Sequence, residues 1–302
     1  MPPRPSSASK IKIGLIGTIN RDTIIRADGI QINSWGGVLY NLKYLSSDKH
    51  FVIYPVINIG GDCVREITRI LSSMPGVGID FINVVQEHNN HCHLTYSDFS
   101  RKSEILTGGV PPLKYSQAKP LLDSDLILVN FISGRDIRLR ELERLRENYK
   151  GLIYIDLHSL ILGRRKTGRG VRRYMRRPRE WERYAACADI LQLNSSEFEL
   201  LAGRKADKKT VTDFYRRHMT GSQLLVITLG QKGCLLVSGK HRIRARLIES
   251  FAVRKVFDTT GCGDIFAAGF IREYLVSSDS VLAAEHGNRL AADRCRQSKK
   301  IF

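Results

Sequence analysis

The stretch Asp258-Thr259-Thr260-Gly261-Cys262-Gly263-Asp264 places two glycines where a predicted short strand, 251–257, turns into a long helix of small and apolar residues. Glycines let the backbone come close to a ligand, and the free N–H groups of a helix start bind phosphate oxygens. A carboxylate at Asp264 would repel that phosphate unless it accepted the proton of an attacking hydroxyl. The alternative is an ordinary helix-capping aspartate beside a tight turn.

The sequence on the N-terminal side of this turn alternates strand and helix patterns. Between the strands lie amphipathic helical patterns such as 63–71 and 139–149, which carry their leucine and isoleucine side chains on one face. Because the strand patterns are apolar throughout, they predict a central, mostly parallel sheet covered by helices on both faces, hence an α/β fold. The predicted strands are 12–17, 51–59, 125–132, 152–157, 189–193 and 224–228.

Two polar, strand-like stretches interrupt the alternation. Residues 21–35 and 91–109 are bounded by Gly-Gly pairs and predict a small antiparallel flap, or lid, inserted into the main domain. We therefore expect a loose tail at 1–10 and one domain at 11–302 with a discontinuous lid. A further hairpin is predicted at 233–247, with its turn at Gly239-Lys240.

Composition limits the class of protein. The chain has 302 residues, a formal net charge of +18 and six cysteines, none of them in a C-x-x-C pair. This favours reduced thiols and a cytoplasmic location over a disulfide framework. Its apolar stretches are shorter than the roughly 20 residues that a bilayer requires, so no membrane partner is expected.

The glycine turn resembles the D-T-x-G-A-G-D signature of the ribokinase-like, or PfkB-type, carbohydrate kinases. The resemblance implies that Asp264 is the catalytic base and that the amides of Gly261, Cys262 and Gly263 form an anion hole for the transferred phosphate. Cys262 stands where alanine is usual, which would expose a thiol to alkylation or oxidation beside the phosphate. Neither a Walker A loop nor a G-x-G-x-x-G motif is present.

The same resemblance implies an acceptor site near the N-terminus. The segment from Gly17 to Asp22 is similar to the family's G-x-x-N-x-D motif, in which Asp22 would bind sugar hydroxyls; the alternative is a turn residue. Gly36 and Gly37 with Asn41 resemble one wall of the sugar pocket; the alternative is a glycine hinge that opens a helix. Val38 replaces the lysine of ribokinase itself, which argues against ribose in particular.

Other motifs imply a nucleotide and a metal. Asn194-Ser195-Ser196-Glu197 resembles the N-x-x-E motif that organises Mg²⁺ and phosphate, often through water, which implies that Asn194 contributes to ATP binding; a helix capping box is the alternative. Thr228, Gly230 and Gly233 match the T-L-G-x-x-G stretch that lines the nucleotide. The implied cofactors are ATP and Mg²⁺, with a monovalent cation such as K⁺. Two lesser expectations are that Asp62 caps a helix and that either 294–299 closes over the adenine or that wall of the site is incomplete.

The basic segment 164–183 leaves three interpretations open. It could be a solvated loop with a helix at 178–187, a rim that grips an already phosphorylated sugar or nucleotide, or a patch for nucleic acid or an acidic partner. A metal site formed by His88, His91, Cys92 and His93 is disfavoured, because in a strand His91 and His93 share one face and Cys92 points to the other. Contact of these histidines with the substrate is the favoured interpretation.

We therefore predict a kinase that transfers the γ-phosphoryl group of ATP to a hydroxyl of a sugar, phosphosugar or nucleoside. The alternative is a catalytically decayed kinase-fold protein that binds nucleic acid or an acidic partner through 164–183. Nucleic acid is the less favoured partner, and the lid is a candidate surface for forming a homodimer.

Overall fold

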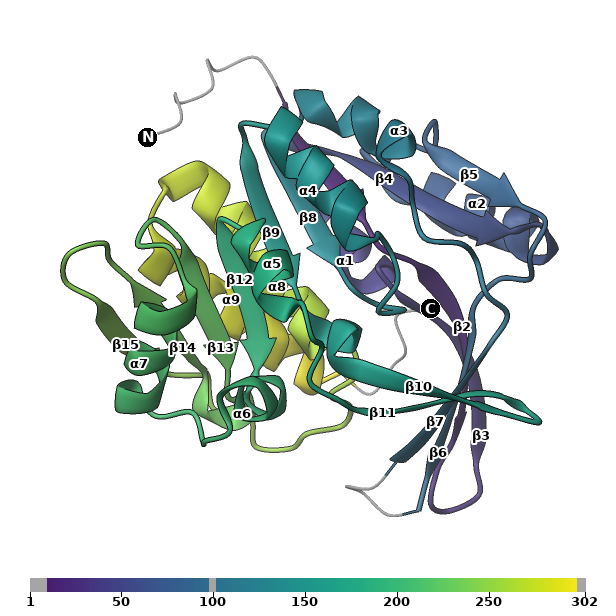
Figure 1. Ribbon diagram of the computed structural model, residues 1–302. Helices are drawn as coiled ribbons and strands as arrows, with labels where there is room; N and C mark the ends of the chain where they lie inside the picture. The colour runs from purple at the N-terminus through teal and green to yellow at the C-terminus, as the bar shows by residue number, and fades with distance from the viewer. Residues whose placement is uncertain (1–9, 98–101, 298–302) are drawn as a thin grey trace.

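The computed structural model describes residues 10–97 and 102–297, so most of the predicted tail lies outside the described residues. A nine-stranded sheet runs through the centre in the order β15-β14-β13-β12-β9-β8-β1-β4-β5 (Figure 1). Its strands are β1 (Ile11–Ile16), β4 (Phe51–Gly60), β5 (Ile82–Val85), β8 (Leu126–Asn130), β9 (Leu152–Asp156), β12 (Ile190–Asn194), β13 (Leu224–Thr228), β14 (Cys234–Ser238) and β15 (Arg244–Ile248).

The sheet is parallel except at one edge, where β14 and β15 form the predicted hairpin. All six predicted core strands are confirmed. In β8, Leu126 and Leu128 pack into one core, whereas Ile127 and Val129 pack into the other. Burial on both faces explains why these strands are apolar throughout instead of alternating.

Helices cover both faces of the sheet (Figure 1). In the predicted helix at 139–149, Leu142 and Leu145 point inward as expected. One face is covered by α1 (Leu39–Leu45), α2 (Val64–Ser72), α8 (Cys262–Ser277) and α9 (Ser280–Cys295). The other is covered by α3 (Tyr115–Ala118), α4 (Leu139–Asn148), α5 (Trp181–Ala186), α6 (Ser195–Ala202) and α7 (Lys208–His218). Among the described residues, no helix is long and apolar enough to cross a membrane.

A second, six-stranded sheet projects from one end of the body in the order β10-β11-β7-β6-β2-β3 (Figure 1). The stretches predicted to form the lid lie in it. The sheet is mixed and not purely antiparallel, because β2 pairs with β6 in parallel. The strands are β2 (Ile19–Ile25), β3 (Gln31–Gly37), β6 (His91–Tyr96), β7 (Lys102–Thr107), β10 (Leu162–Thr167) and β11 (Gly170–Met175).

The solvated loop considered for 164–183 is wrong. Most of this segment forms the hairpin β10–β11, which joins the lid through pairing of β11 with β7. The charges of this segment concealed the strand pattern in the sequence. Arg173, its buried arginine, can lie in the interior because Glu104 of β7, far away in the sequence, neutralises its charge. Only the short helix α5 matches the expected helical part.

The predicted strand at 251–257 is also wrong, since this stretch has no regular secondary structure. Phe251, Val256 and Phe257 are exposed, and Phe257 N–H donates to Cys295 O (2.9 Å) instead of to a neighbouring strand. The aromatic and branched residues suggested a strand, but the sheet ends at β15. The long helix predicted after the glycine turn is confirmed as α8.

Candidate active site

The glycine turn enters α8 in a conformation that requires glycine. Gly261 has φ +76°, and a Cβ atom there would lie 2.5 Å from Tyr40 Cδ1. Within the described part of the chain, the N–H groups of Gly261 and Gly263 donate to no acceptor, whereas Cys262 N–H donates to Thr259 O (3.2 Å). Two of the three predicted anion-hole amides are thus available to a ligand, at the positive end of a helix.

Asp258, the first residue of the motif, fixes the shape of the loop. Its Oδ1 accepts a hydrogen bond from Thr260 N–H (2.8 Å), and its Oδ2 forms an ion pair with Arg294 of α9. Arg294 is 1% exposed, so the expectation that it covers an adenine is wrong for this residue. Residues 298 and 299 of that predicted wall lie outside the described residues.

Asp264 lies in the first turn of α8 and is 7% exposed. Its Oδ1 accepts a hydrogen bond from Asn130 Nδ2 (2.6 Å), at the end of β8. Burial raises the pKa of Asp264 to about 7, and the hydrogen bond from Asn130 opposes that rise. A carboxylate with a pKa near neutrality is suited to accept a proton at physiological pH.

Asn41 does not face an open pocket. It is fully buried; its Nδ2 donates to the backbone oxygen of Asp264 (2.8 Å), and its Oδ1 accepts from Asn130 Nδ2 (3.0 Å). The structure therefore places Asn41 behind Asp264, where it is bonded to the backbone of that residue. Sequence reasoning missed Asn130, whose only signal is an amide at the end of an otherwise apolar strand.

Two more buried acids lie near Asp264. Burial raises the pKa of Glu197 to about 7, with a hydrogen bond from Asn194 N–H opposing the rise and the charge of Asp264 adding to it. Burial, together with the charges of Glu197 and Asp264, raises the pKa of Asp156 well above its usual range. Asp156 Oδ2 accepts from Gln192 Nε2 (2.8 Å). These acids share one edge of the sheet, where their negative charges repel one another.

The capping interpretation of the N-x-x-E motif is confirmed. Asn194 is the N-cap of α6: its Oδ1 accepts from Glu197 N–H (2.9 Å), and Glu197 Oε2 accepts from Asn194 N–H (2.9 Å). The magnesium role of Glu197 stays a prediction. Among the described residues, no group of three or more His, Cys, Asp or Glu side chains has metal-binding geometry.

Asp22 points into the body from β2 and is 8% exposed. A Cβ atom on Gly36 would lie 2.1 Å from Asp22 Oδ2, and one on Gly37 (φ +69°) would lie 2.2 Å from Thr18 O. Packing and backbone shape alone thus explain both glycines. Burial raises the pKa of Tyr40, and the charges of Asp22, Asp258 and Asp264 add to the effect. Asp22 and Asp264 therefore lie near the same tyrosine.

The predicted nucleotide segment lies at the start of the β14–β15 hairpin. Gly233 has φ +95°, and a Cβ atom there would lie 2.0 Å from Ile248 O; Thr228 Oγ1 donates to Leu193 O (3.5 Å). Gly230 also has a positive φ, +59°. These three residues shape the loop, and it is the intervening side chains that line the adjacent cavity.

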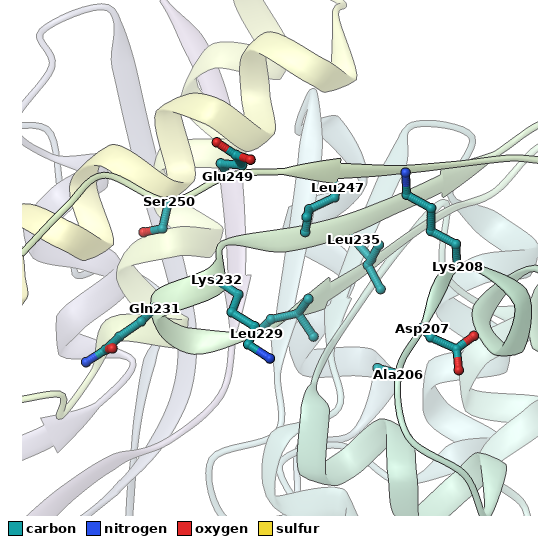
Figure 2. A pocket seen from close by; sticks show the side chains of 10 residues that line it. All are labelled: Ala206, Asp207, Lys208, Leu229, Gln231, Lys232, Leu235, Leu247, Glu249 and Ser250. Atoms are coloured by element: carbon teal, nitrogen blue, oxygen red, sulfur yellow. The ribbon is translucent and has the colours of Figure 1, made fainter.

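That cavity has a volume of about 460 Å³ (Figure 2). None of Asp22, Asp264 and the anion-hole residues lines this cavity. It is lined by Ala206, Asp207, Lys208, Leu229, Gln231, Lys232, Leu235, Leu247, Glu249 and Ser250.

Two smaller expectations concern the base of the lid. Asp62 does not cap α2, which has no side-chain cap; it accepts from Asn89 N–H (2.8 Å) and so ties the body to the chain entering the lid. His91 and His93 do share a face, with their rings stacked 4.0 Å apart, while Cys92 is buried. Contact of the histidines with a substrate stays a prediction.

Residues 172–301 match the family model described as pfkB family carbohydrate kinase. The chain is 24% identical over 274 residues to a cytidine kinase of Thermococcus kodakarensis, covering 86% of this chain and 87% of that protein. It is 35% identical over 99 residues to the probable fructokinase-3 of Arabidopsis thaliana. The match spans only 26% of that fructokinase, and 36% of an uncharacterized sugar kinase of Archaeoglobus fulgidus.

Solved structures share the fold over nearly the whole chain. A pyrophosphate-dependent kinase in the ribokinase family aligns with a TM-score of 0.74 at 16% identity, covering 94% of this chain and 95% of that one. A ribokinase from Thermotoga maritima aligns with a TM-score of 0.70 at 18% identity, covering 95% and 93% of the two chains. At these identities the likeness establishes the fold alone.

Proposed function

Because the chain belongs to the ribokinase-like, PfkB-type family of carbohydrate kinases, we propose that it transfers the γ-phosphoryl group of ATP to a hydroxyl of a sugar, phosphosugar or nucleoside. One observation carries the proposal. A buried carboxylate with a pKa near neutrality, Asp264, lies in the same helix turn as two amides that have no acceptor among the described residues.

A few residues account for each step of the proposed phosphoryl transfer. Asp264 accepts the proton of the acceptor hydroxyl, while Asn130 and Asn41 hold its side chain and its backbone in place. The amides of Gly261 and Gly263 stabilise the charge on the phosphoryl group during transfer. Asp22 binds acceptor hydroxyls from the lid, as a carboxylate can accept two donors.

The donor set at the acidic edge fits Mg²⁺, which prefers oxygen ligands and keeps several waters. Glu197 and Asp156 would hold the ion, in part through water, because a nearby cation favours the charged form of buried acids. When bound, Mg²⁺ neutralises charge on the phosphates of the nucleotide. The roles of Asn194, Thr228, Gly230 and Gly233 in nucleotide binding, and that of K⁺, stay predictions.

Two broader aspects belong to the proposal. All six cysteines are free thiols, which supports a reducing, cytoplasmic location. Among the described residues, no strand pairs with the outer edge of β3 in the lid, which supports pairing of this edge with a second subunit in a homodimer.

The test measures phosphorylated product by mass spectrometry for fructose, ribose, cytidine and fructose 6-phosphate, each with Mg²⁺ and either ATP or pyrophosphate. We expect turnover with at least one acceptor, and a loss of about 10²–10⁴-fold in kcat for Asp264→Asn, with ATP binding retained. No turnover with any pair, together with salt-dependent binding of an oligonucleotide, would support a decayed kinase instead.

A further inference from the structure

The hairpin β10–β11 carries arginines on both faces of the lid. Arg164 and Arg173 are directly opposite each other across the two strands, as are Arg165 and Arg172 one step away. Successive side chains of a strand point to opposite faces. Arg164 and Arg173 therefore share one face of the lid, and Arg165 and Arg172 share the other.

Arg173 identifies which face is turned toward the body. It is 8% exposed; its Nη1 donates to Ile132 O (3.2 Å), its Nη2 donates to Ser159 Oγ, and its Nε lies 2.9 Å from Glu104 Oε1. Ile132 lies two residues beyond the end of β8 at Asn130, and Ser159 lies three residues beyond the end of β9 at Asp156. The face with Arg164 and Arg173 thus covers the end of the sheet where the proposed chemistry takes place.

A third arginine joins them from the body. Arg135 is exposed and follows Gly134, whose backbone packs so closely on Ser159 that an added Cβ would lie 2.3 Å from Ser159 O. Partial burial lowers the pKa of Arg164, and the positive charges of Arg135 and Arg173 lower it further. These charges are therefore close enough to repel.

In the part of the chain that the structure describes, a carboxylate balances one of the three charges. Arg173 pairs with Glu104, whereas over residues 10–97 and 102–297 the side chains of Arg135 and Arg164 have no carboxylate partner. Clustering guanidinium groups costs free energy unless an anion joins them. A guanidinium fork matches phosphate oxygens with two parallel hydrogen bonds.

Asp22, the residue proposed to bind the acceptor substrate, lies on the same face of the lid as Arg164 and Arg173. Asp22 is opposite Cys92 in the pairing of β2 with β6. Burial raises the pKa of the Cys92 thiol, and the charges of Glu104 and Asp22 raise it further while that of Arg173 lowers it. The inner face of the lid thus presents Asp22 for hydroxyl groups at one side and the unpaired Arg164 at the other, with Glu104 and Arg173 between them.

We propose that the acceptor is a phosphorylated sugar, whose phosphomonoester is bound by Arg135 and Arg164 while Asp22 binds its hydroxyls. This inference rests on the proposed kinase function and selects one of its acceptor classes. A nucleic-acid partner would instead use the outer face, where Arg165 and Arg172 lie beside the exposed Tyr174.

The experiment compares sugar pairs that differ only in the phosphate: ribose with ribose 5-phosphate, and fructose with fructose 6-phosphate. In at least one of these pairs, the wild type should show a higher kcat/KM for the phosphorylated sugar than for the free sugar. Arg164→Ala should raise the KM for that acceptor by about 10- to 100-fold, the usual effect of losing a charge-assisted hydrogen bond, and leave the KM for ATP unchanged. Arg165→Ala is the matched control, because it removes the same charge from the other face of the same strand, and it should leave both KM values unchanged.

The possible failures are distinguishable. If no acceptor is turned over at all, the kinase proposal fails and this inference with it. If free sugars or cytidine are used as well as the phosphosugars and Arg164→Ala has no effect, the kinase stands and the phosphosugar inference is wrong. A loss of oligonucleotide binding in Arg165→Ala but not in Arg164→Ala, without an effect of Arg164→Ala on the KM for the acceptor, would replace it with a nucleic-acid surface on the outer face.

Discussion

Replacing Asp264 with asparagine should lower kcat by about 10²–10⁴-fold and at the same time stabilise the protein. The carboxyl is buried and its pKa is raised from 3.8 to about 7, so ionising it in the folded state is costly. A difference of about three pKa units corresponds to about 4 kcal/mol, at 1.4 kcal/mol per unit. Asparagine is neutral, fills nearly the same volume, and can still accept the hydrogen bond from Asn130.

The sign of the pH dependence follows from proton uptake. Between pH 4 and pH 7 the folded state holds a proton on Asp264 that the unfolded chain has released, so raising the pH through this window lowers the free energy of unfolding. The cost is fully present above pH 7 and absent below about pH 4. At pH 8 we expect Asp264→Asn to be more stable than the wild type by about 1–4 kcal/mol, and the gain should disappear toward pH 4.

Urea denaturation of both proteins from pH 4.5 to pH 8.5 measures this difference. Glu197 and Asp156 titrate with the same sign, and the charge of Asp264 raises their pKa values, so the difference between the two proteins measures position 264 together with its effect on these two acids. Asp80→Asn, at an exposed aspartate, is the control and should change stability little. A variant less stable than the wild type at pH 8, or a difference that does not vary with pH, would refute the assignment of a buried, proton-accepting carboxyl.

Three other substitutions test the supporting residues. Gly261→Ala should destabilise the protein by at least about 1 kcal/mol and abolish turnover, because its φ is positive and its Cβ would meet Tyr40; thermal melting checks this. Gly263→Ala should leave the melting temperature unchanged yet slow turnover, since its Cβ meets only Gln192 Nε2 at 3.8 Å in the protein, and a stability loss would contradict an open amide site. Asn130→Ala should lower kcat and move the acidic limb of the kcat–pH profile to higher pH, because Asn130 stabilises the charged carboxylate; an unmoved limb would rule out this role.

The central sheet was predictable because its strands are buried on both faces. A parallel strand covered by helices must be apolar throughout, so runs such as 126–130 and 152–156 are visible in the sequence without tertiary information. The glycine turn was predictable for a related reason. Its backbone conformation and the place of its carboxylate in the first turn of α8 are set by residues that are neighbours in the chain.

The parts that sequence reasoning missed depend on distant partners. Asn41 resembled a ligand-binding amide, but it bonds to the backbone of a residue 223 positions away. Asn130 ends an ordinary strand, and its role depends on Asp264, 134 positions away. The lid hairpin was concealed because the neutralising partner of Arg173 is Glu104, on another strand. Such pairings are properties of the folded chain.

The position of the terminal phosphate of a bound nucleotide tests the central claim most directly. A crystal structure with a non-hydrolysable ATP analogue and Mg²⁺ should place oxygens of that phosphate about 3 Å from the amide nitrogens of Gly261 and Gly263, beside Asp264. A terminal phosphate bound elsewhere, for example in the cavity between Lys208 and Lys232, with the amides at the start of α8 empty, would contradict the account.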